Sequence, residues 1–389
     1  MLAWVAPLIV FGLVVFVHEL GHFLAAKAVG VYTPRFSIGF GKALLRKRWG
    51  ETEYILAALP LGGYVRMASR DDEATAFIEG GSEKAVTKVA TKGEELDPEA
   101  MVPFGPKPIP PHRWLESQPL WARLVILLAG VTMNIVLALF VTTGMLAHYG
   151  MPYLSTTTDS VLVGRPADLA GVRAGDSIVA INAVPQLAWD SVIAKIGSSL
   201  ARELTLEVRR DGVPRTIRVT PVEDTSRSAA TGRIEKIGRI GILPRVGTRP
   251  IGIGEAAVKS WGITWGMAGS VIGALKGLAT RQVAASELGG PIMIATASVQ
   301  AARGGFENLL LLISLISVNL AVFNLLPIPI LDGGQILVSL LEAAKGSAFS
   351  LKTRDLILRA GLAAVLLLFA LVTYNDLRRL LVSLIQRFG

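Results

Sequence analysis

The sequence predicts a polytopic α-helical membrane protein with about four transmembrane helices, a membrane-associated β-hairpin and one inserted α+β domain. The 389-residue chain is 51% hydrophobic with a mean hydropathy of +0.52, which is more apolar than a typical soluble enzyme. Several apolar runs are long enough to cross about 30 Å of hydrocarbon as helices. One internal stretch instead alternates apolar and polar residues between turn signals, as short strands do.

These elements divide the chain into consecutive parts. The expected boundaries are 1–30 for the first transmembrane helix, 31–119 for a cytoplasmic loop with the hairpin, 120–150 for the second transmembrane helix, 151–250 for the inserted domain, 251–305 for an interfacial amphipathic region, 306–342 for the third transmembrane segment, and 343–389 for a loop and the fourth transmembrane helix.

The first apolar run, Leu2 to about Val29, contains the sequence His-Glu-Leu-Gly-His at residues 18–22. On a helix, His18 and His22 lie one turn apart on one face, where two imidazoles can bind Zn²⁺ and Glu19 can act as general base. The bare pattern constrains three positions and also arises by chance in ordinary helices. Ionisable side chains are costly at bilayer depth, however, so their presence there favours a functional site. We therefore predict His18 and His22 as zinc ligands and Glu19 as the catalytic residue.

The amino-acid composition limits which side chains can bind the metal and which partner the positive charge can have. The chain has no cysteine, which excludes disulfides, thiolate ligands and a cysteine nucleophile, so histidine and carboxylate must hold the metal. The net charge of +9 does not indicate nucleic acid, because no nucleic-acid-binding module is recognisable and much of the excess flanks apolar segments. The lipid bilayer is the expected partner of this charge.

The orientation of the chain across the membrane is predicted from the basic residues that follow the first apolar run. This run is expected to be retained, because it carries the motif and lacks the basic segment that precedes the apolar part of a signal peptide. Arg35, Lys42 and residues 46–48 follow it, and no positive charge precedes it. The positive-inside rule therefore places the N-terminus outside and the following loop in the cytoplasm.

Two β-like stretches, 34–40 and 52–67, follow the first run. Their glycines and short apolar runs predict hairpin strands that are separated by a basic turn. Residues 71–111 are polar and become proline-rich toward their end, which predicts a loosely ordered loop. His112 follows this loop and is expected to be a surface residue rather than a metal ligand.

The second apolar run, Leu120 to about Tyr149, returns the chain to the outer side. Within it, Gly130 and Asn134 lie one turn apart and share one helix face. Close helix packing with one polar contact explains this pair, and a role in the site explains it equally well. His148, at the outer end of the run, is expected at the membrane interface rather than on the metal.

The inserted domain has the local signals of a small soluble fold. Its expected elements are strands at 204–208 and 216–219, a hairpin turn at 211–212 and a helix at 189–201. Residues 171–182 resemble the corresponding stretch of PDZ domains, which bind extended peptides by adding a strand to a sheet edge. A peptide-binding or substrate-sorting module and a folded spacer that excludes bulky substrates are both consistent with this resemblance.

Residues 254–279 have apolar side chains at three-to-four spacing with lysines at both ends of the segment. Such a helix can span the membrane or lie on its surface. A further crossing would reverse the direction of the next long run, 309–341, and would move Asp332 toward the wrong face. We therefore expect residues 254–279 to form an interfacial helix on the outer surface.

The run at 309–341 contains Pro327 and Pro329 shortly before Asp332. The prolines predict a bent or unwound segment whose freed carbonyls are satisfied by protein or water. At about 1.5 Å per residue, His18 and Asp332 both fall in the cytoplasmic half of the membrane. Asp332 is then the expected third metal ligand, with a fourth position open for water. The alternative for Asp332 is a turn residue beside two glycines.

The fourth apolar run extends from Ala360 to about Tyr374 and would return the C-terminus to the outside. Arg378, Arg379 and Arg387 favour the opposite orientation of this end. We retain four spans because the early basic loop has the larger charge bias.

Together, HExxH in the first span, Leu-Asp-Gly in a late span and a PDZ-like insert resemble the site-2 protease family of intramembrane zinc metalloproteases, in particular its bacterial regulator-of-sigma-E branch. Further matching stretches are 60–65, 130–134 and 287–292. The best-known member has two tandem PDZ domains, whereas this chain has room for one.

The resemblance implies a multi-pass protein of the bacterial inner membrane, with its active site toward the cytoplasm and its PDZ-like domain in the periplasm. It implies Zn²⁺ as cofactor and transmembrane proteins as substrates, namely an anti-sigma factor already trimmed by a first protease, and signal-peptide remnants. The implied substrate-binding residues are Gly62, Gly63 and Tyr64, in a re-entrant hairpin that holds the substrate as a strand, and Asn324, which contacts the substrate backbone. Asn134 is a further candidate substrate-binding residue.

Two other classes of function compete with this interpretation. In a metal or proton transporter, the same ionisable residues would form a relay beside a broken helix, but no inverted hydropathy repeat is visible. A non-catalytic PDZ scaffold would leave HExxH and Asp332 without a purpose.

Overall fold

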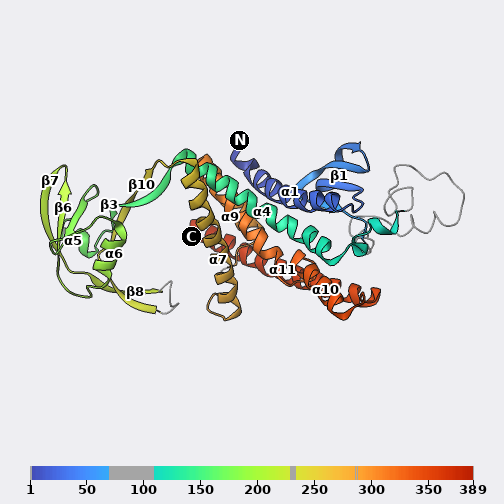
Figure 1. The fold of residues 1–389 in the computed structure, drawn as a ribbon. Helices are drawn as coiled ribbons and strands as arrows, with labels where there is room; N and C mark the ends of the chain where they lie inside the picture. Colours follow the sequence, from blue (N-terminus) through green and yellow to red (C-terminus); the bar gives the residue numbers. More distant parts are fainter. Residues whose placement is uncertain (1, 70–108, 228–233, 285, 287, 389) are drawn as a thin grey trace, which may run out of the picture. The chain divides into compact units, whose positions relative to one another are not determined.

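The computed structural model describes residues 2–69, 109–227, 234–284, 286 and 288–388. Nearly all of the predicted polar loop at 71–111, together with Glu287 of the 287–292 stretch, lies outside these residues. The chain divides into two compact units, one formed by Met1–Met145 with Ile253–Gly389 and the other by Leu146–Gly252. Figure 1 shows the elements of each.

Among the described residues, four helices are long and apolar enough to cross a membrane, and they are α1 (Leu2–Ala28), α4 (Leu120–Tyr149), α9 (Phe306–Asn324) and α11 (Leu351–Phe388). Only 6% of the most apolar window of α11 is buried inside the protein. Soluble proteins rarely expose so much contiguous apolar surface, so these faces fit lipid. The chain is a multi-pass membrane protein. α11 begins before and ends after the predicted run at 360–374.

Three of these helices pack together in the first unit. Val10 and Val14 of α1 and Ile313 of α9 form a buried cluster to which α4 adds Leu137 and Val141. A hydrogen bond also joins two of these helices beside the cluster. Thr142 of α4 donates it to the hydroxyl of Ser314 of α9 over 3.1 Å. Apolar packing and interhelical hydroxyl contacts are the usual means of helix association in membranes.

The predicted helix at 254–279 is present as α7 (Ile253–Ala279). Its Ala268 packs with Ala138 of α4 and Val318 of α9, and its Ser260 is hydrogen-bonded to Thr143 over 2.7 Å. α7 therefore lies against two of the apolar helices, although it is not among the four candidate spans in the described part of the chain. Its interfacial position stays a prediction.

A small sheet follows α1. β1 (Arg35–Trp49) and β2 (Thr52–Arg66) pair as antiparallel strands with Trp49 opposite Thr52. The basic residues 42–48 lie within β1, so the prediction that they form the turn is wrong. Positive φ angles at Gly39 and Gly41, 90° and 85°, permit a bend in β1 that side chains would strain. Residues 35–38 are consequently paired with both 53–56 and 63–66.

Glu51, in the turn of this sheet, is held by two cations. Arg113 of η1 (Pro111–Arg113) donates to both carboxylate oxygens, over 2.7 and 2.8 Å, and also to the carbonyl of Gly30. Lys27, near the end of α1, forms an ion pair with the same carboxylate. The hydrogen bonds from Arg113, with the help of Lys27, lower the pKa of Glu51 to about 2. This contact ties the turn of the sheet to the end of α1.

The C-terminal helices are connected by buried polar contacts. α8 (Pro291–Arg303) begins where Asp376 of α11 accepts hydrogen bonds from the backbone N–H groups of Gly290, Ile292 and Met293, over 2.9 to 3.1 Å. A Cβ on Gly290 would lie 2.8 Å from this carboxylate. The Gly-Pro sequence in the 287–292 stretch therefore allows an aspartate of another helix to cap α8.

The second unit contains a sheet with the strand order β10-β3-β4-β6-β7. The strands are β3 (Met151–Val161), β4 (Ser177–Ile181), β6 (Leu204–Arg210), β7 (Val213–Val219) and β10 (Ile242–Arg249), with β5 (Val184–Pro185) paired to β4. A separate pair is formed by β8 (Val222–Arg227) and β9 (Ile234–Arg239). The helices of the unit are α5 (Pro166–Leu169) and α6 (Trp189–Gly197).

This unit has its own hydrophobic core, in which Trp189 and Val192 of α6 pack with Ile178 and Leu206 of the sheet. The predicted hairpin turn is confirmed, since Asp211 and Gly212 have φ angles of 50° and 81°, as two-residue turns between twisted strands require. The predicted helix is shorter than expected, because α6 ends at Gly197 instead of Ala201.

The Glu51 contact predicts a pH-dependent loss of stability. A carboxylate whose pKa is lowered on folding stabilises the protein above its unfolded pKa, here 4.5, and this contribution is lost as the pH falls toward about 2. In detergent, the difference in thermal unfolding midpoint between wild type and Glu51→Gln should be largest at neutral pH and should shrink below about pH 4.5.

The control is Asp355→Asn, because Asp355 pairs with Arg359 on an exposed face, where side-chain exposures are 49% and 77% and such pairs contribute little. A difference for Glu51→Gln that stays constant over the whole pH range would contradict the role of this contact.

Candidate metal centre

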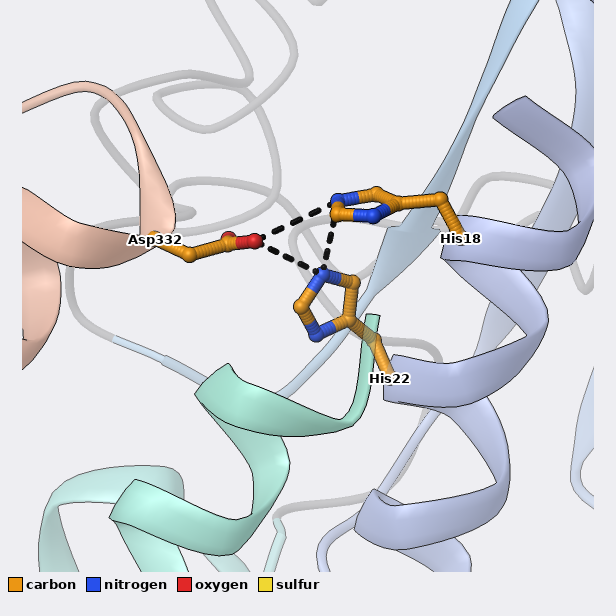
Figure 2. Close-up of side chains that lie close together, drawn as sticks. All are labelled: His18, His22 and Asp332. Carbon is orange, nitrogen blue, oxygen red and sulfur yellow. Dashed lines mark hydrogen bonds and ion pairs between the residues drawn. The ribbon is translucent and has the colours of Figure 1, made fainter. Parts of the chain in front are cut away.

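His18 and His22 lie on one face of α1, one turn apart, and are 5% and 6% exposed. Asp332 is the first residue of α10 (Asp332–Lys345). Figure 2 shows both imidazoles extending from α1 toward the carboxylate at the start of α10. The structure thus brings two neighbouring histidines together with an aspartate that is more than three hundred positions away in the sequence.

A break in the helical chain brings Asp332 to this position. α9 ends at Asn324, and the segment with Pro327 and Pro329 turns before α10 begins. The turn is tight, because a Cβ on Gly333 or Gly334 would collide with the backbone carbonyls of Leu325 or Ile328. The predicted interruption is present, and it explains why two glycines follow the aspartate.

The three donor atoms are spaced as a metal requires. Nε2 of His18 lies 3.2 Å from Nε2 of His22, and Oδ2 of Asp332 lies 3.3 and 3.4 Å from these nitrogens. Ligand bonds of about 2.0–2.2 Å in a tetrahedral zinc site place ligand atoms roughly 3.3–3.6 Å apart. Oδ2 is buried and has no hydrogen-bond partner among the described residues. Both observations fit a bound cation with two histidines and one carboxylate.

The orientation of the His22 ring is fixed by a hydrogen bond on the side opposite to Nε2. Its Nδ1 donates a hydrogen bond to the backbone carbonyl of Ile126 on α4, over 2.8 Å. A neutral imidazole has one proton, so a proton on Nδ1 leaves the lone pair of Nε2 free for a metal. This carbonyl cannot be identified from sequence, because every residue has one and only packing selects Ile126.

Glu19 lies beside the three donors without joining them. The backbone N–H of Val65 in β2 donates a hydrogen bond to its carboxylate, and Gly63 is so close that a Cβ there would lie 3.5 Å from Cγ of Glu19. The sheet therefore holds the candidate general base in place. The sequence pattern indicated Glu19 but contained no signal for its contact with Val65.

Gly130 makes the close approach of α4 to the imidazoles possible. A Cβ on Gly130 would collide with Nε2 of His22 and would lie 2.8 Å from Cε1 of His18. On the opposite helix, a Cβ on Gly21 would collide with the carbonyl of Ala129. The small residues at positions 21 and 130 thus allow the two helices to touch at the centre.

The other predicted site residues lie at different distances from the centre. Asn324, at the end of α9, has Nδ2 3.0 Å from Nε2 of His18, and Asn134 has Nδ2 3.3 Å from Nδ1 of the same ring. Gly62, Gly63 and Tyr64 lie in β2, where Tyr64 stacks on the ring of Phe40. The ligand group does not include His112 or His148.

A model of the family described as "Peptidase family M50" matches residues 6–368. The chain belongs to Peptidase family M50. It is 30% identical over 424 residues to the zinc metalloprotease RasP of Bacillus licheniformis, with 97% of this chain and 99% of the relative covered. It is also 30% identical to the regulator of sigma-W protease RasP of Bacillus subtilis, with 97% and 98% covered. A putative zinc metalloprotease of Brucella suis is 31% identical, with 95% and 93% covered.

Membership of this family confirms the resemblance to site-2 proteases that the motifs predicted. The M50 protein is an intramembrane zinc metalloprotease, and its cofactor is Zn²⁺. The cluster of His18, His22 and Asp332 has the donor set and the spacing for this ion. The transporter and scaffold alternatives are not supported.

The role of Gly130 predicts a sharp difference between two glycines of α4. Gly130→Ala should abolish zinc binding and proteolysis, because the added methyl group occupies the space of the His22 imidazole. Gly144→Ala is the matched control, since a Cβ there meets nothing within 4 Å. Zinc content and cleavage are measured on the same purified samples. Normal zinc content in Gly130→Ala would show that α4 does not limit the site.

Proposed function

We propose that His18, His22 and Asp332 hold the catalytic zinc, that Glu19 is the general base, and that the enzyme cleaves transmembrane segments of membrane proteins. The observation that carries this proposal is the spacing of the three donor atoms, 3.2 to 3.4 Å, beside the Glu19 carboxylate. Bound zinc would supply a Lewis acid for the scissile carbonyl and would lower the pKa of the attacking water. Glu19 would accept the proton of that water and pass it to the leaving amine.

The substrate must unwind before it can be cut, because the carbonyl of a helical peptide bond is hydrogen-bonded and shielded from water. The segment Gly62–Tyr64 of β2 is a suitable place for the unwound chain. Since a Cβ on Gly63 would lie 3.5 Å from Cγ of Glu19, a substrate strand along this segment would lie beside the general base. Asn324, within 3.0 Å of His18, would contact the substrate backbone on the other side.

An anti-sigma factor is the proposed physiological substrate, with signal-peptide remnants as a second class. Support comes from the relative in Bacillus subtilis, whose name makes it a regulator of sigma-W. We propose an inner-membrane location with the metal site toward the cytoplasm, because the basic residues 42–48 of β1 follow α1. The helix α7 would then lie at the outer surface, within the interfacial region 251–305.

The second unit is proposed to be a single PDZ-like domain on the periplasmic side. Its support is the stretch 171–182, in which Asp176 is fully buried, accepts a hydrogen bond from the backbone N–H of Arg173 and is paired with Arg210 over 2.7 Å. These contacts fix the loop that leads into β4. The domain would either bind the end of a trimmed substrate or exclude substrates that still have a bulky outer domain.

The function is tested by separating metal binding from proton transfer. Glu19→Gln should reduce cleavage of a transmembrane substrate by about 10²–10⁴-fold while zinc content stays unchanged, because the ligands are intact. Asp332→Ala should lower both zinc content and activity, since it removes a ligand. Asn324→Ala should retain zinc and impair cleavage. Wild-type cleavage rates in Glu19→Gln would exclude the proposed mechanism.

The role of the second unit is tested by shortening it within its own sheet. Val161 of β3 and Ile242 of β10 are direct partners, so residues 162–241 can be replaced by Asn-Gly, which forms a two-residue turn. The shortened enzyme should keep its zinc, still cut a pre-trimmed helix and begin to cut untrimmed substrate. Loss of cleavage of the trimmed substrate in a zinc-loaded enzyme would mean that the unit delivers or aligns the substrate instead.

A further inference from the structure

Asn134 of α4 is a fully buried amide in contact with the metal centre. Its exposure is 0%, and its Nδ2 lies 3.3 Å from Nδ1 of His18. The oxygen of the same amide, Oδ1, is buried and has no hydrogen-bond partner among the residues that the structure describes. A buried acceptor of this kind costs about 1–3 kcal/mol if it stays unsatisfied. Packing alone does not account for an amide with such a cost.

The chemistry of His18 indicates which amide atom should face it. Nε2 is the nitrogen that points toward Asp332 and His22, so a metal at the centre needs the lone pair of Nε2. The proton of the neutral ring must then be on Nδ1, and Nδ1–H needs an acceptor. An amide NH₂ cannot accept this proton, whereas Oδ1 can.

A half-turn of the Asn134 amide exchanges Oδ1 and Nδ2 with almost no change of shape. It brings the unsatisfied oxygen onto the Nδ1–H of His18. One rotation therefore gives a buried acceptor its donor and gives a metal-ligating imidazole its acceptor.

We propose that Asn134 is a positioning residue of the metal centre, whose amide oxygen accepts the Nδ1 proton of His18 and so keeps Nε2 free for zinc. This rests on the proposed function, in which His18 is a zinc ligand. The proposal replaces a contact between Asn134 and substrate, because the side chain is enclosed by protein.

The surroundings of Asn134 suit this role. Ile126, Gly130 and Asn134 follow one another at intervals of one turn on the same face of α4. The first accepts the Nδ1 proton of His22, and the second leaves room for both rings. The backbone carbonyl of Asn134 also accepts a hydrogen bond from Ser317 of α9 over 2.8 Å. One face of α4 thus orients both imidazoles, and α9 holds that face.

Outer contacts of this kind typically change metal affinity by about 10–100-fold when they are removed. The experiment uses the full chain in detergent with three variants. Asn134→Leu removes the acceptor, Asn134→Asp keeps an oxygen in its place, and Thr142→Val removes a buried hydroxyl on α4 that contacts Ser314 and not the imidazoles. Zinc affinity is measured by competition with a chelator, and folding of the metal-free variants by thermal unfolding.

Asn134→Leu should bind zinc about 10–100-fold more weakly, whereas Asn134→Asp and Thr142→Val should stay close to wild type. A second readout is the ¹⁵N spectrum of labelled histidine, which is simple because the chain has four histidines. In the zinc-loaded wild type, His18 should show a protonated Nδ1 whose proton exchanges slowly with solvent. In Asn134→Leu this exchange should be faster.

Three results would overturn the inference, namely an unprotonated Nδ1 on His18 in the zinc-loaded wild type, wild-type zinc affinity in Asn134→Leu, or equal losses in Asn134→Leu and Asn134→Asp. The first of these needs no variant, so the test survives if a substitution prevents folding. A wild-type enzyme that bound zinc with no change in the His18 spectrum would overturn the proposed ligand set as well, which separates failure of the function from failure of this inference.

Discussion

The contact between α1 and α4 at Gly21 and Gly130 is the constraint on which the rest of the centre depends. Neither position has room for a Cβ, and the closeness of the two helices is what brings the carbonyl of Ile126 to His22 and the amide of Asn134 to His18. Polar groups inside a membrane protein must be satisfied by the protein itself, since lipid offers no hydrogen bonds. A wider spacing between the helices would separate His22 from the Ile126 carbonyl and His18 from the Asn134 amide.

The second requirement is that α10 presents Asp332 at the right depth. The break after α9 makes this possible, and its carbonyls are packed against Gly333 and Gly334. The far part of α10 is held by a buried ion pair, because Arg354 of α11 donates to Glu342 over 2.9 and 3.1 Å and Arg123 of α4 lies 3.6 Å from the same carboxylate. Removing one partner of such a buried pair is strongly destabilising, so α10 is fixed at both ends.

The sheet of β1 and β2, where we propose that the substrate strand binds, lies directly against the candidate general base. Val65 is hydrogen-bonded to Glu19 and Gly63 lies close to it, while Glu51 ties the turn of the sheet to α1. A strand placed along this sheet is therefore aligned by the same backbone that holds the candidate base. The second unit has an independent hydrophobic core, so it can be shortened without removing any residue of the candidate metal centre.

The sequence by itself determined the features that depend on local patterns. Apolar runs, the HExxH spacing, the prolines before Asp332 and the Asp211–Gly212 turn are properties of neighbouring residues, and each predicted element is present. Local sequence patterns did not predict the correct structure where strand pairing or tertiary packing outweighs the charge or helix propensity of the residues. The basic residues 42–48 extend a strand because they pair with β2, and α6 ends four positions before its predicted end.

Only the tertiary structure decided which groups contact the Nδ1 atoms of the two candidate ligands, His18 and His22. The carbonyl of Ile126 is 104 positions from His22 and the amide of Asn134 is 116 positions from His18, and no sequence period connects such distant groups. The sequence left Asn134 open between packing and a role in the site. The contact between α1 and α4 decides its surroundings, because it buries the amide against Nδ1 of His18, the nitrogen that would carry a proton with zinc on Nε2.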